Sequence, residues 1–315
     1  MLPSFHACVD IGGTKVAVSL ADSLSLTTLQ LLARRSEATV KQGTSDALSQ
    51  QIIRMVCAAC AEQGIALEQI ASVGVSSCGP FVQRAGALEL AAPNICGGIA
   101  GPARGLPNNW VSAPLEAPLR AAFPQVRIAN DAIAALEAER RWGALKGYDH
   151  CAYVTWSTGI GMGLCVDGRV LRGKNSNAGH AGHMFVSKHA DALCGCGNYG
   201  DLEAVVAGNA IQRRFGQDAA TLLVAAGAGD VEATTHVDEL CEVMGRALYN
   251  LIVTLDLQRI SLGGSVFWHH QALLLPKLRA QIKGKLAALT DHCDIVPAGL
   301  GLQVGDCAAL ALVVG

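Results

Sequence analysis

Imidazole, thiol and carboxylate side chains gather within residues 175–203, in a chain that is otherwise poor in charge. This stretch contains Gly-His-Ala-Gly-His and, after a short spacer, Cys-Gly-Cys-Gly. Thiolates are good zinc ligands, and the glycine between the two cysteines lets both thiols point the same way. The pattern predicts a structural zinc site whose ligands are His183, Cys194 and Cys196, with Asp201 or water as the fourth. The alternative interpretation is a glycine-rich loop that carries two buried free cysteines.

Two glycine-rich turns are suited to holding phosphate. Asp-Ile-Gly-Gly-Thr-Lys occupies residues 10–15 between two short apolar runs, which predicts a hairpin between two strands. Glycine N–H groups can approach phosphate oxygens there, Thr14 and Lys15 add donors, and Asp10 can hold a magnesium ion through water. Alone, this motif is explained more simply by an ordinary hairpin turn. A second such turn, Ser-Thr-Gly-Ile-Gly at residues 157–161, predicts a duplicated α/β architecture with phosphate held between its halves.

A carboxylate lies at a predicted junction between a strand and a helix. The apolar run 126–129 leads directly into Asn130 and Asp131, which precede a helical pattern that continues to about Arg141. Either residue could cap that helix. A carboxylate at this place is also well positioned to take a proton from a bound hydroxyl. From the local sequence, capping is the simpler interpretation.

Three further stretches are rich in turn-forming residues. Cys78-Gly79-Pro80 ends the apolar strand at residues 72–76, and loops at the carboxyl ends of strands are where α/β sheets place ligands. Gly263-Gly264-Ser265 ends another strand and could pass close to a nucleotide. Residues 91–110 contain many Gly, Pro and Asn residues. They predict a polar loop that faces a substrate, although an ordinary surface loop fits almost as well.

The composition restricts the class of protein. At 315 residues the chain is long enough for two domains. About half of the residues are apolar, few are aromatic and glycine is abundant, which favours an α/β protein with tight connections. A net charge of −2 gives no electrostatic footprint for nucleic acid or an anionic membrane. No run approaches the ~18 apolar residues of a membrane span, and no signal segment is present. The 12 cysteines are scattered through apolar segments, as in reduced cytoplasmic proteins.

The elements that must position these side chains can also be predicted. The expected helices cover residues 208–215, 219–226, 231–255 and, with an interruption at Pro276, 266–287. We expect a smaller N-terminal α/β domain at residues 1–125 and a larger C-terminal α/β domain at residues 126–305. A final apolar helix within residues 306–315 is expected to pack back on the first domain.

In this order, the motifs resemble those of the ROK family of sugar kinases over essentially the whole chain. Residues 10–15 look like its first phosphate loop, and residues 157–161 look like its second. Asn130-Asp131 matches the pair that holds its catalytic aspartate, and Gly263-Gly264-Ser265 matches its adenosine-side turn. Gly182-His183 and the Cys-Gly-Cys-Gly segment match its zinc motif. The resemblance implies an α/β, actin-like (ribonuclease H-like) duplicated two-domain ATPase fold that closes on ATP and a sugar.

The resemblance also implies an ATP-dependent kinase that transfers the γ-phosphoryl group to the C6 hydroxyl of a hexose or N-acylhexosamine. Asp131 would act as the general base, while Mg²⁺ and the two hairpins neutralise charge on the phosphates. The expected sugar contacts are Gly79, Asn94, Asn130, His180, His183 and Glu203. The expected ATP contacts are Asp10, Gly12, Gly13, Thr14, Lys15, Thr158, Gly159, Gly161, Gly263, Gly264 and Ser265.

Two positions depart from the general pattern of the family. Most members carry a glutamate where this chain has His180, and that side chain contacts the sugar near C1 and C2. A histidine there, with Asn-Ile-Cys-Gly-Gly at residues 94–98, is similar to bacterial N-acetylmannosamine kinases. N-acetylmannosamine is therefore the expected substrate, and glucokinase activity is the alternative. Asp201 replaces the third zinc cysteine, and a carboxylate is a weaker zinc ligand than a thiolate.

Two other classes of function compete with the kinase. A sugar sensor that keeps the fold without catalysis would explain the altered sugar and zinc positions, but the intact Asp10, Asp131 and phosphate loops argue against it. The family also contains repressors with a helix-turn-helix domain, for which the early first strand leaves no room. We expect sugar and ATP as ligands, Zn²⁺ and Mg²⁺ as metals, a homodimer, no nucleic acid or membrane partner, and a cytoplasmic location.

Overall fold

The computed structural model describes residues 4–23, 29–100, 105–189 and 191–314, so residues 101–104 of the predicted substrate-facing loop lie outside it. The chain divides into two compact units. The first unit comprises Met1–Ala138, Arg172–Ala178 and Gly305–Gly315, and the second comprises Glu139–Leu171 and Gly179–Val304. No helix in the described ranges combines the length and apolar character that a membrane span needs.

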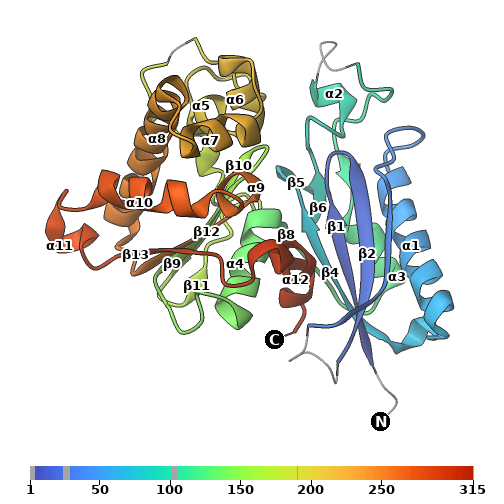
Figure 1. Ribbon diagram of the computed structural model, residues 1–315. Helices are drawn as coiled ribbons and strands as arrows, with labels where there is room; N and C mark the ends of the chain where they lie inside the picture. The colour runs from blue at the N-terminus through green and yellow to red at the C-terminus, as the bar shows by residue number, and fades with distance from the viewer. Residues whose placement is uncertain (1–3, 24–28, 101–104, 190, 315) are drawn as a thin grey trace. The chain divides into compact units, whose positions relative to one another are not determined.

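The first unit is built on a five-stranded sheet with the order β3-β2-β1-β4-β8 (Figure 1). The strands are β1 (Phe5–Ile11), β2 (Lys15–Asp22), β3 (Leu31–Ala38), β4 (Ile70–Ser77) and β8 (Val126–Asn130). The first three strands pair antiparallel, whereas β1, β4 and β8 run parallel. Because Ile11 pairs with Ser77 and Ser77 pairs with Asn130, the carboxyl ends of these parallel strands lie at one edge of the sheet.

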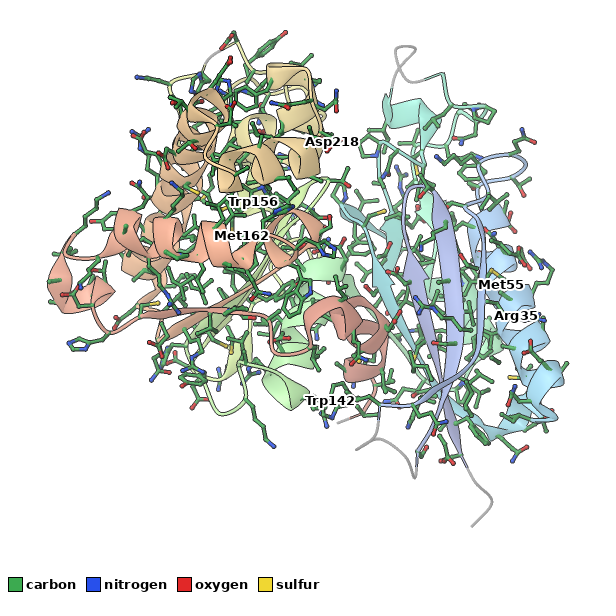
Figure 2. The ribbon with its side chains drawn as sticks, in the orientation of Figure 1. Arg35, Met55, Trp142, Trp156, Met162 and Asp218 are labelled. Atoms are coloured by element: carbon green, nitrogen blue, oxygen red, sulfur yellow. The ribbon has the colours of Figure 1, made fainter. Side chains whose placement is uncertain are left out.

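Helices and a smaller sheet complete the first unit. They are α1 (Ala47–Gln63), α2 (Gly97–Ala100), α3 (Glu116–Ala122), α4 (Asp131–Trp142), α12 (Val304–Ala311), β5 (Phe81–Arg84), β6 (Ala87–Leu90) and β7 (Ala113–Pro114). Helix α1 packs on β2 and β3, and its buried stripe includes Met55 (Figure 2). It ends at Gly64, whose left-handed backbone (φ 65°) suits glycine at a helix end.

The second unit repeats this plan. Its sheet has the order β11-β10-β9-β12-β13 (Figure 1). The first three strands in this order pair antiparallel, whereas β9, β12 and β13 run parallel. The strands are β9 (Cys151–Trp156), β10 (Ile160–Val166), β11 (Arg169–Val170), β12 (Arg259–Gly263) and β13 (Asp294–Pro297). Trp156 and Met162 are fully buried in its core (Figure 2). The matching strand orders show the duplication that the two glycine-rich turns predict.

The helices of the second unit pack mainly around one long helix, α8. They are α5 (Leu202–Val206), α6 (Gly208–Phe215), α7 (Ala219–Gly227), α8 (Val231–Leu255), α9 (Ser265–Trp268), α10 (Gln271–Ile282) and α11 (Ala287–Thr290). Asp230 caps α8 by accepting the Ala233 N–H at 2.8 Å. Pro276 lies inside α10 instead of interrupting it. Burial of Leu274 and Leu278 stabilises that helix despite the missing proline N–H, and the break falls at residues 269–270.

The first unit extends beyond the boundary expected at residue 125. It includes β8 and α4 as far as Ala138, because β8 is hydrogen-bonded to β4 as the edge strand of the first unit's sheet. The C-terminal segment Gly305–Gly315 also belongs to this unit. Helix α12 packs closely on β4, since a β-carbon built on Gly74 would lie 1.9 Å from the Ala309 carbonyl oxygen.

Candidate active site and metal centre

The first glycine-rich turn is a hairpin that joins β1 to β2 at the carboxyl end of β1. The Gly12 N–H donates to the Lys15 carbonyl at 2.9 Å. From outside the turn, Thr39 Oγ1 donates to the Gly12 carbonyl at 2.7 Å, and the Thr39 N–H donates to the Thr14 carbonyl at 3.1 Å. The turn is therefore held both by its own strands and by the residue that follows β3.

Asp10 lies on β1 beside this turn, among other charged groups. Burial raises the pKa of its carboxyl, while the Lys15 ammonium and a hydrogen bond to Ser76 lower it. Asp306 raises the Asp10 pKa further, although Asp306 is itself ion-paired to Arg34 at 2.5 Å. A cavity of about 30 Å³ is lined by Asp10 and these charged side chains, which is room for a water molecule. The site suits a carboxylate that holds a cation through water.

Asn130 and Asp131 divide the two roles that the sequence leaves open. Asn130 is buried, with 4% of its surface exposed, and its Oδ1 accepts the Ala132 N–H at 3.0 Å. Asn130 therefore caps α4 at the end of β8. Asp131 is exposed, and its Oδ1 accepts the same N–H at 2.7 Å. The structure thus places an exposed carboxylate at the first turn of α4, where the backbone dipoles favour negative charge.

Asn94 lies in the turn between β6 and α2, and its side chain reaches the first hairpin. A β-carbon built on Gly13 would lie 2.3 Å from Asn94 Nδ2. Asn94 also hydrogen-bonds the Cys78 thiol, whose pKa burial raises to about 12 with help from the charges of Asp131 and Asp10. Asn94 Oδ1 is buried and accepts no hydrogen bond within the described ranges. These side chains therefore share one region of the first unit and leave one acceptor for a ligand.

The turn after β4 carries Gly79, which a cis peptide bond joins to Pro80. The next residue, Phe81, is fixed by Asn177 through two hydrogen bonds. Its N–H donates to Asn177 Oδ1 at 2.8 Å, and Asn177 Nδ2 donates to its carbonyl at 2.7 Å. The chemistry-rich stretch of residues 175–203 therefore begins in the first unit and continues in the second.

The second glycine-rich turn joins β9 to β10 and contacts the turn after β12. Ser157 Oγ lies 3.1 Å from Ser265 Oγ. Gly264 has a φ of 88°, and a β-carbon there would lie 2.4 Å from the Trp156 carbonyl oxygen. The two turns predicted to hold ATP therefore touch in the second unit. Gly161 lies within β10, where it pairs with Thr155 of β9.

The four predicted zinc ligands come together in the second unit. The nitrogen, sulfur and oxygen atoms that His183, Cys194, Cys196 and Asp201 offer all lie within 4.8 Å of one another. His183 Nδ1 is 3.1 Å from Asp201 Oδ2 and 3.6 Å from Cys194 Sγ. Cys196 Sγ is 3.4 Å from Asp201 Oδ2. Four ligands at ordinary zinc bond lengths in a tetrahedron are separated by about 3.3–3.8 Å, so the arrangement fits zinc.

The surroundings of the cluster also suit a cation. Asp201 is completely buried, and its Oδ1 caps α5 by accepting the Ala204 N–H at 2.8 Å. Its Oδ2 faces the histidine and thiol ligands. Burial raises the pKa of the Cys194 thiol well above its usual range, a hydrogen bond from the Cys196 backbone lowers it in part, and Asp201 adds to the rise. A cation would stabilise both the buried carboxylate and the thiolate form of Cys194.

Glu203 connects this cluster with the second hairpin. Its Oε1 lies 3.8 Å from Cys194 Sγ, and its Oε2 accepts the Ile160 N–H at 2.9 Å. His180 lies edge-on to His183, with ring centroids 6.4 Å apart. Burial lowers the pKa of His180, and the neighbouring His183 lowers it further. Glu203 therefore contacts both the metal cluster and the second hairpin, while His180 lies against His183 of the cluster.

Comparison with known proteins decides the family. The profile of the ROK family matches residues 6–315, which is nearly the whole chain. The chain belongs to the ROK family.

Three similar proteins illustrate the range of the ROK relatives. N-acetylmannosamine kinase of Salmonella typhimurium is 32% identical over 266 residues, which cover 82% of each chain. The ROK hexokinase of Thermus thermophilus is 28% identical with a TM-score of 0.75, covering 98% of this chain and 97% of that one. A ROK glucokinase of Streptomyces griseus in complex with glucose and AMPPNP is 26% identical with a TM-score of 0.71, covering 99% and 100%. The predicted actin-like α/β fold is confirmed.

The predicted site residues of this ROK protein group by unit. In the first unit lie Asp10, Gly12, Gly13, Thr14, Lys15, Gly79, Asn94, Asn130 and Asp131. In the second unit lie Thr158, Gly159, Gly161, His180, His183, Cys194, Cys196, Asp201, Glu203, Gly263, Gly264 and Ser265. Within each unit, the contacts above bring a glycine hairpin together with side chains predicted to bind sugar.

Sequence reasoning missed two residues of this ROK site. Cys78 contacts Asn94 beside Asp131, and its position directly before Gly79-Pro80 at a strand end was the available signal. Thr39 braces the first hairpin, but nothing in its local sequence distinguishes it from other residues at a strand end.

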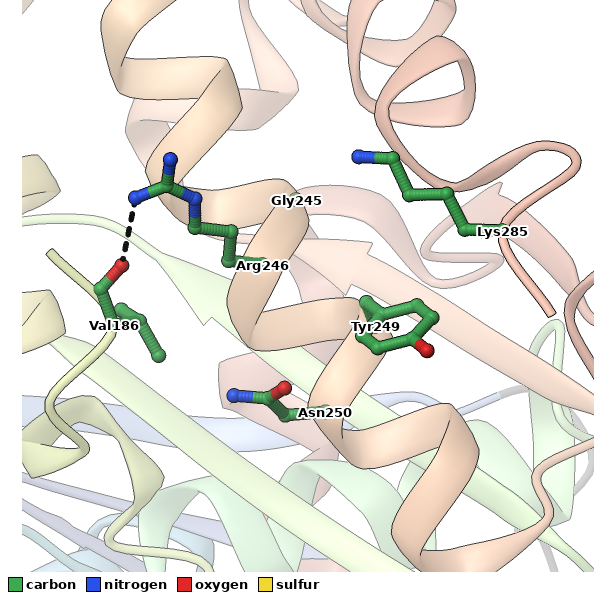
Figure 3. Close-up of a pocket in the computed structure, with 6 residues that line it drawn as sticks. All are labelled: Val186, Gly245, Arg246, Tyr249, Asn250 and Lys285. Carbon is green, nitrogen blue, oxygen red and sulfur yellow. Dashed lines mark hydrogen bonds between the residues drawn. The ribbon is translucent and has the colours of Figure 1, made fainter.

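A cavity of about 180 Å³ in the second unit, lined by Val186, Tyr249 and Lys285 among others, contains none of the predicted site residues (Figure 3).

Proposed function

We propose that this protein is an ATP-dependent kinase that phosphorylates the C6 hydroxyl of a hexose or N-acylhexosamine. The observation that carries the proposal is the exposed carboxylate of Asp131 at the carboxyl end of β8, beside Cys78 and Asn94. A general base for a sugar hydroxyl needs this combination of access and fixed position. The kinases named among its relatives, which act on N-acetylmannosamine and glucose, support the same chemistry.

In this proposal each unit supplies a distinct set of groups. Asp131 accepts the proton of the C6 hydroxyl as that oxygen bonds to the γ-phosphorus, and the bond from the γ-phosphorus to the bridging oxygen breaks so that ADP leaves. Asn94 Oδ1 accepts a hydrogen bond from another sugar hydroxyl, which would partner a buried acceptor that has no partner among the described residues. The two glycine hairpins would present N–H groups to the phosphates, and Asp10 would hold Mg²⁺ through water. Mg²⁺, when bound with ATP, neutralises charge on the phosphate oxygens.

N-acetylmannosamine is the substrate that we propose, with glucose as the alternative. Burial lowers the pKa of His180, so its imidazole is neutral at neutral pH and offers one donor and one acceptor. A glutamate would instead accept hydrogen bonds from two hydroxyls as an anion. A neutral imidazole is less committed to such a pair and can accommodate the altered C2 geometry of a mannosamine derivative. The similarity to an N-acetylmannosamine kinase supports this choice.

A coupled assay of ADP release across N-acetylmannosamine, glucose, mannose and N-acetylglucosamine tests the proposed function. We expect sugar-dependent turnover, with the highest kcat/KM for N-acetylmannosamine. The product should carry phosphate on O6, which phosphorus NMR can establish. Tight ATP binding without turnover on any sugar would instead identify a sugar sensor and overturn the kinase proposal.

The choice of substrate is expected to depend on His180. The variant His180→Glu should raise the ratio of kcat/KM for glucose to kcat/KM for N-acetylmannosamine by about tenfold, the value of one hydrogen bond. The reason is that a carboxylate can accept hydrogen bonds from the C1 and C2 hydroxyls that glucose presents. His180→Gln, which keeps a neutral donor and acceptor, serves as the control and should change the ratio much less. An unchanged ratio in His180→Glu would show that this residue does not determine specificity.

A further inference from the structure

The space beside Gly13 is occupied by the side chain of Asn94. A β-carbon built on Gly13 would lie 2.3 Å from Asn94 Nδ2, 2.9 Å from Cγ and 3.3 Å from Cβ. Real β-carbons essentially never approach another atom within 3.0 Å. The adjacent Gly12 differs, because its β-carbon would meet only the Lys15 carbonyl oxygen, at 3.3 Å. Only one of the two glycines in the hairpin therefore makes room for a side chain predicted to bind the sugar.

Of the two partners in this contact, the hairpin is the more firmly held. Thr39 hydrogen-bonds both sides of the turn, and the Gly12 N–H bonds within it. Asn94, in contrast, presents a side-chain amide whose Oδ1 accepts no hydrogen bond in the described part of the chain. Because the hairpin is bonded on both sides and Asn94 Oδ1 is not bonded within the described residues, a methyl group at residue 13 would displace the Asn94 side chain and leave the hairpin in place.

The second unit shows the same relation independently. A β-carbon built on Gly159 would lie 2.9 Å from Glu203 Oε2. The same oxygen accepts the Ile160 N–H at 2.9 Å, so the carboxylate is bonded to the residue after the turn. Each glycine hairpin predicted to hold phosphate thus contacts one side chain predicted to hold sugar.

We propose that the glycine hairpins are positioning elements of the sugar site as well as phosphate loops. This inference rests on the proposed sugar kinase function and adds a route by which the two substrates affect each other. Phosphates that fix the conformation of the first hairpin also fix the position of the Asn94 side chain. In the same way, a sugar hydroxyl bonded to Asn94 Oδ1 restricts the motion of the hairpin. By thermodynamic linkage, a non-hydrolysable ATP analogue and the sugar should then tighten each other's binding by the same factor.

The variants Gly13→Ala and Gly12→Ala form a matched test, with sugar binding measured by calorimetry in the absence of nucleotide. Neither glycine has a positive φ, so alanine causes no backbone strain at either position and the two variants differ in what the new methyl group meets. We expect Gly13→Ala to weaken binding of N-acetylmannosamine about tenfold, which is the loss of one neutral hydrogen bond. Gly12→Ala is expected to bind the sugar within about twofold of the wild type. Melting temperatures of both variants should remain close to that of the wild type.

A double variant identifies Asn94 as the intermediary. On the background of Asn94→Ala, which removes the carboxamide, Gly13→Ala should weaken sugar binding by no more than about twofold. If Gly13→Ala keeps wild-type sugar affinity without nucleotide and only raises the KM for ATP, the hairpin is a phosphate loop alone and the inference fails. The wild type, measured in the same experiment, separates this failure from a failure of the proposed function. If the wild type binds sugar, the comparison of variants tests the inference alone. If the wild type binds none of the tested sugars, both the inference and the proposed function are overturned.

Discussion

Replacing Asp131 with asparagine is expected to lower kcat by about 10³-fold while leaving the fold intact, because an amide cannot accept the hydroxyl proton. Asparagine keeps an oxygen that can accept the Ala132 N–H, and it is itself a good residue for the start of a helix. The KM for the sugar should change little, since the variant retains the shape and the other sugar contacts. Single-turnover measurements with saturating ATP and sugar separate the chemical step from binding.

Glu137→Gln provides a control on the same helix. It removes one negative charge from α4, as Asp131→Asn does, and Glu137 is paired only loosely with Arg172 at 3.5 Å. We expect kcat to remain within about twofold of the wild type, because surface ion pairs contribute little. If Asp131→Asn retained near-normal turnover, Asp131 would not be the general base, and the exposed carboxylate at the end of β8 would only help to begin α4.

The fold could be predicted largely because its signals are local. Short apolar runs followed by glycine turns occur twice, and each marks a hairpin that opens a five-stranded sheet. Helix α8 is predicted at its observed bounds because an aspartate cap and a long apolar period agree. Pro276 misleads, since local propensity disfavours proline within a helix but burial of one helix face decides the outcome.

The candidate site was predictable where its residues are close in sequence. The candidate ligand set His183, Cys194, Cys196 and Asp201 could be predicted because its members lie at most eighteen residues apart, and their ligand atoms lie within 4.8 Å of one another. The contact between Gly13 and Asn94 could not be found in this way. Nothing in either local sequence indicates the other, since only the completed first unit brings a hairpin and a distant turn into contact.

The bond from Glu203 to the Ile160 N–H escaped prediction for a similar reason. Glu203 was identified from its place in a motif, as a residue expected to bind the sugar. Its hydrogen bond is made to Ile160, the first residue of β10, and nothing in the local sequence of Glu203 indicates that partner. The structure therefore adds physical connections between motifs that the sequence presents as separate.

Those connections give the metal centre a predictable effect on activity. We expect one zinc ion per chain in protein purified without chelator, and less than about a tenth of an equivalent in Cys194→Ser. Cys194 is buried, contacts His183 and lies 3.8 Å from Glu203, so its loss removes a ligand at the centre of the cluster. The buried Asp201 would then lack its cation, and we expect the melting temperature to fall by about 10 °C.

The sugar site should weaken together with the metal centre. His183 and Glu203 are held through the cluster, so we expect kcat/KM for the sugar to fall about 100-fold in Cys194→Ser, as when partners of a metal site are removed. Cys57→Ser, at an exposed cysteine of α1, is the control and should change neither zinc content nor activity. Wild-type protein that contains no zinc, yet melts and turns over as Cys57→Ser does, would show that hydrogen bonds among His183, Asp201 and the two thiols suffice to hold this loop.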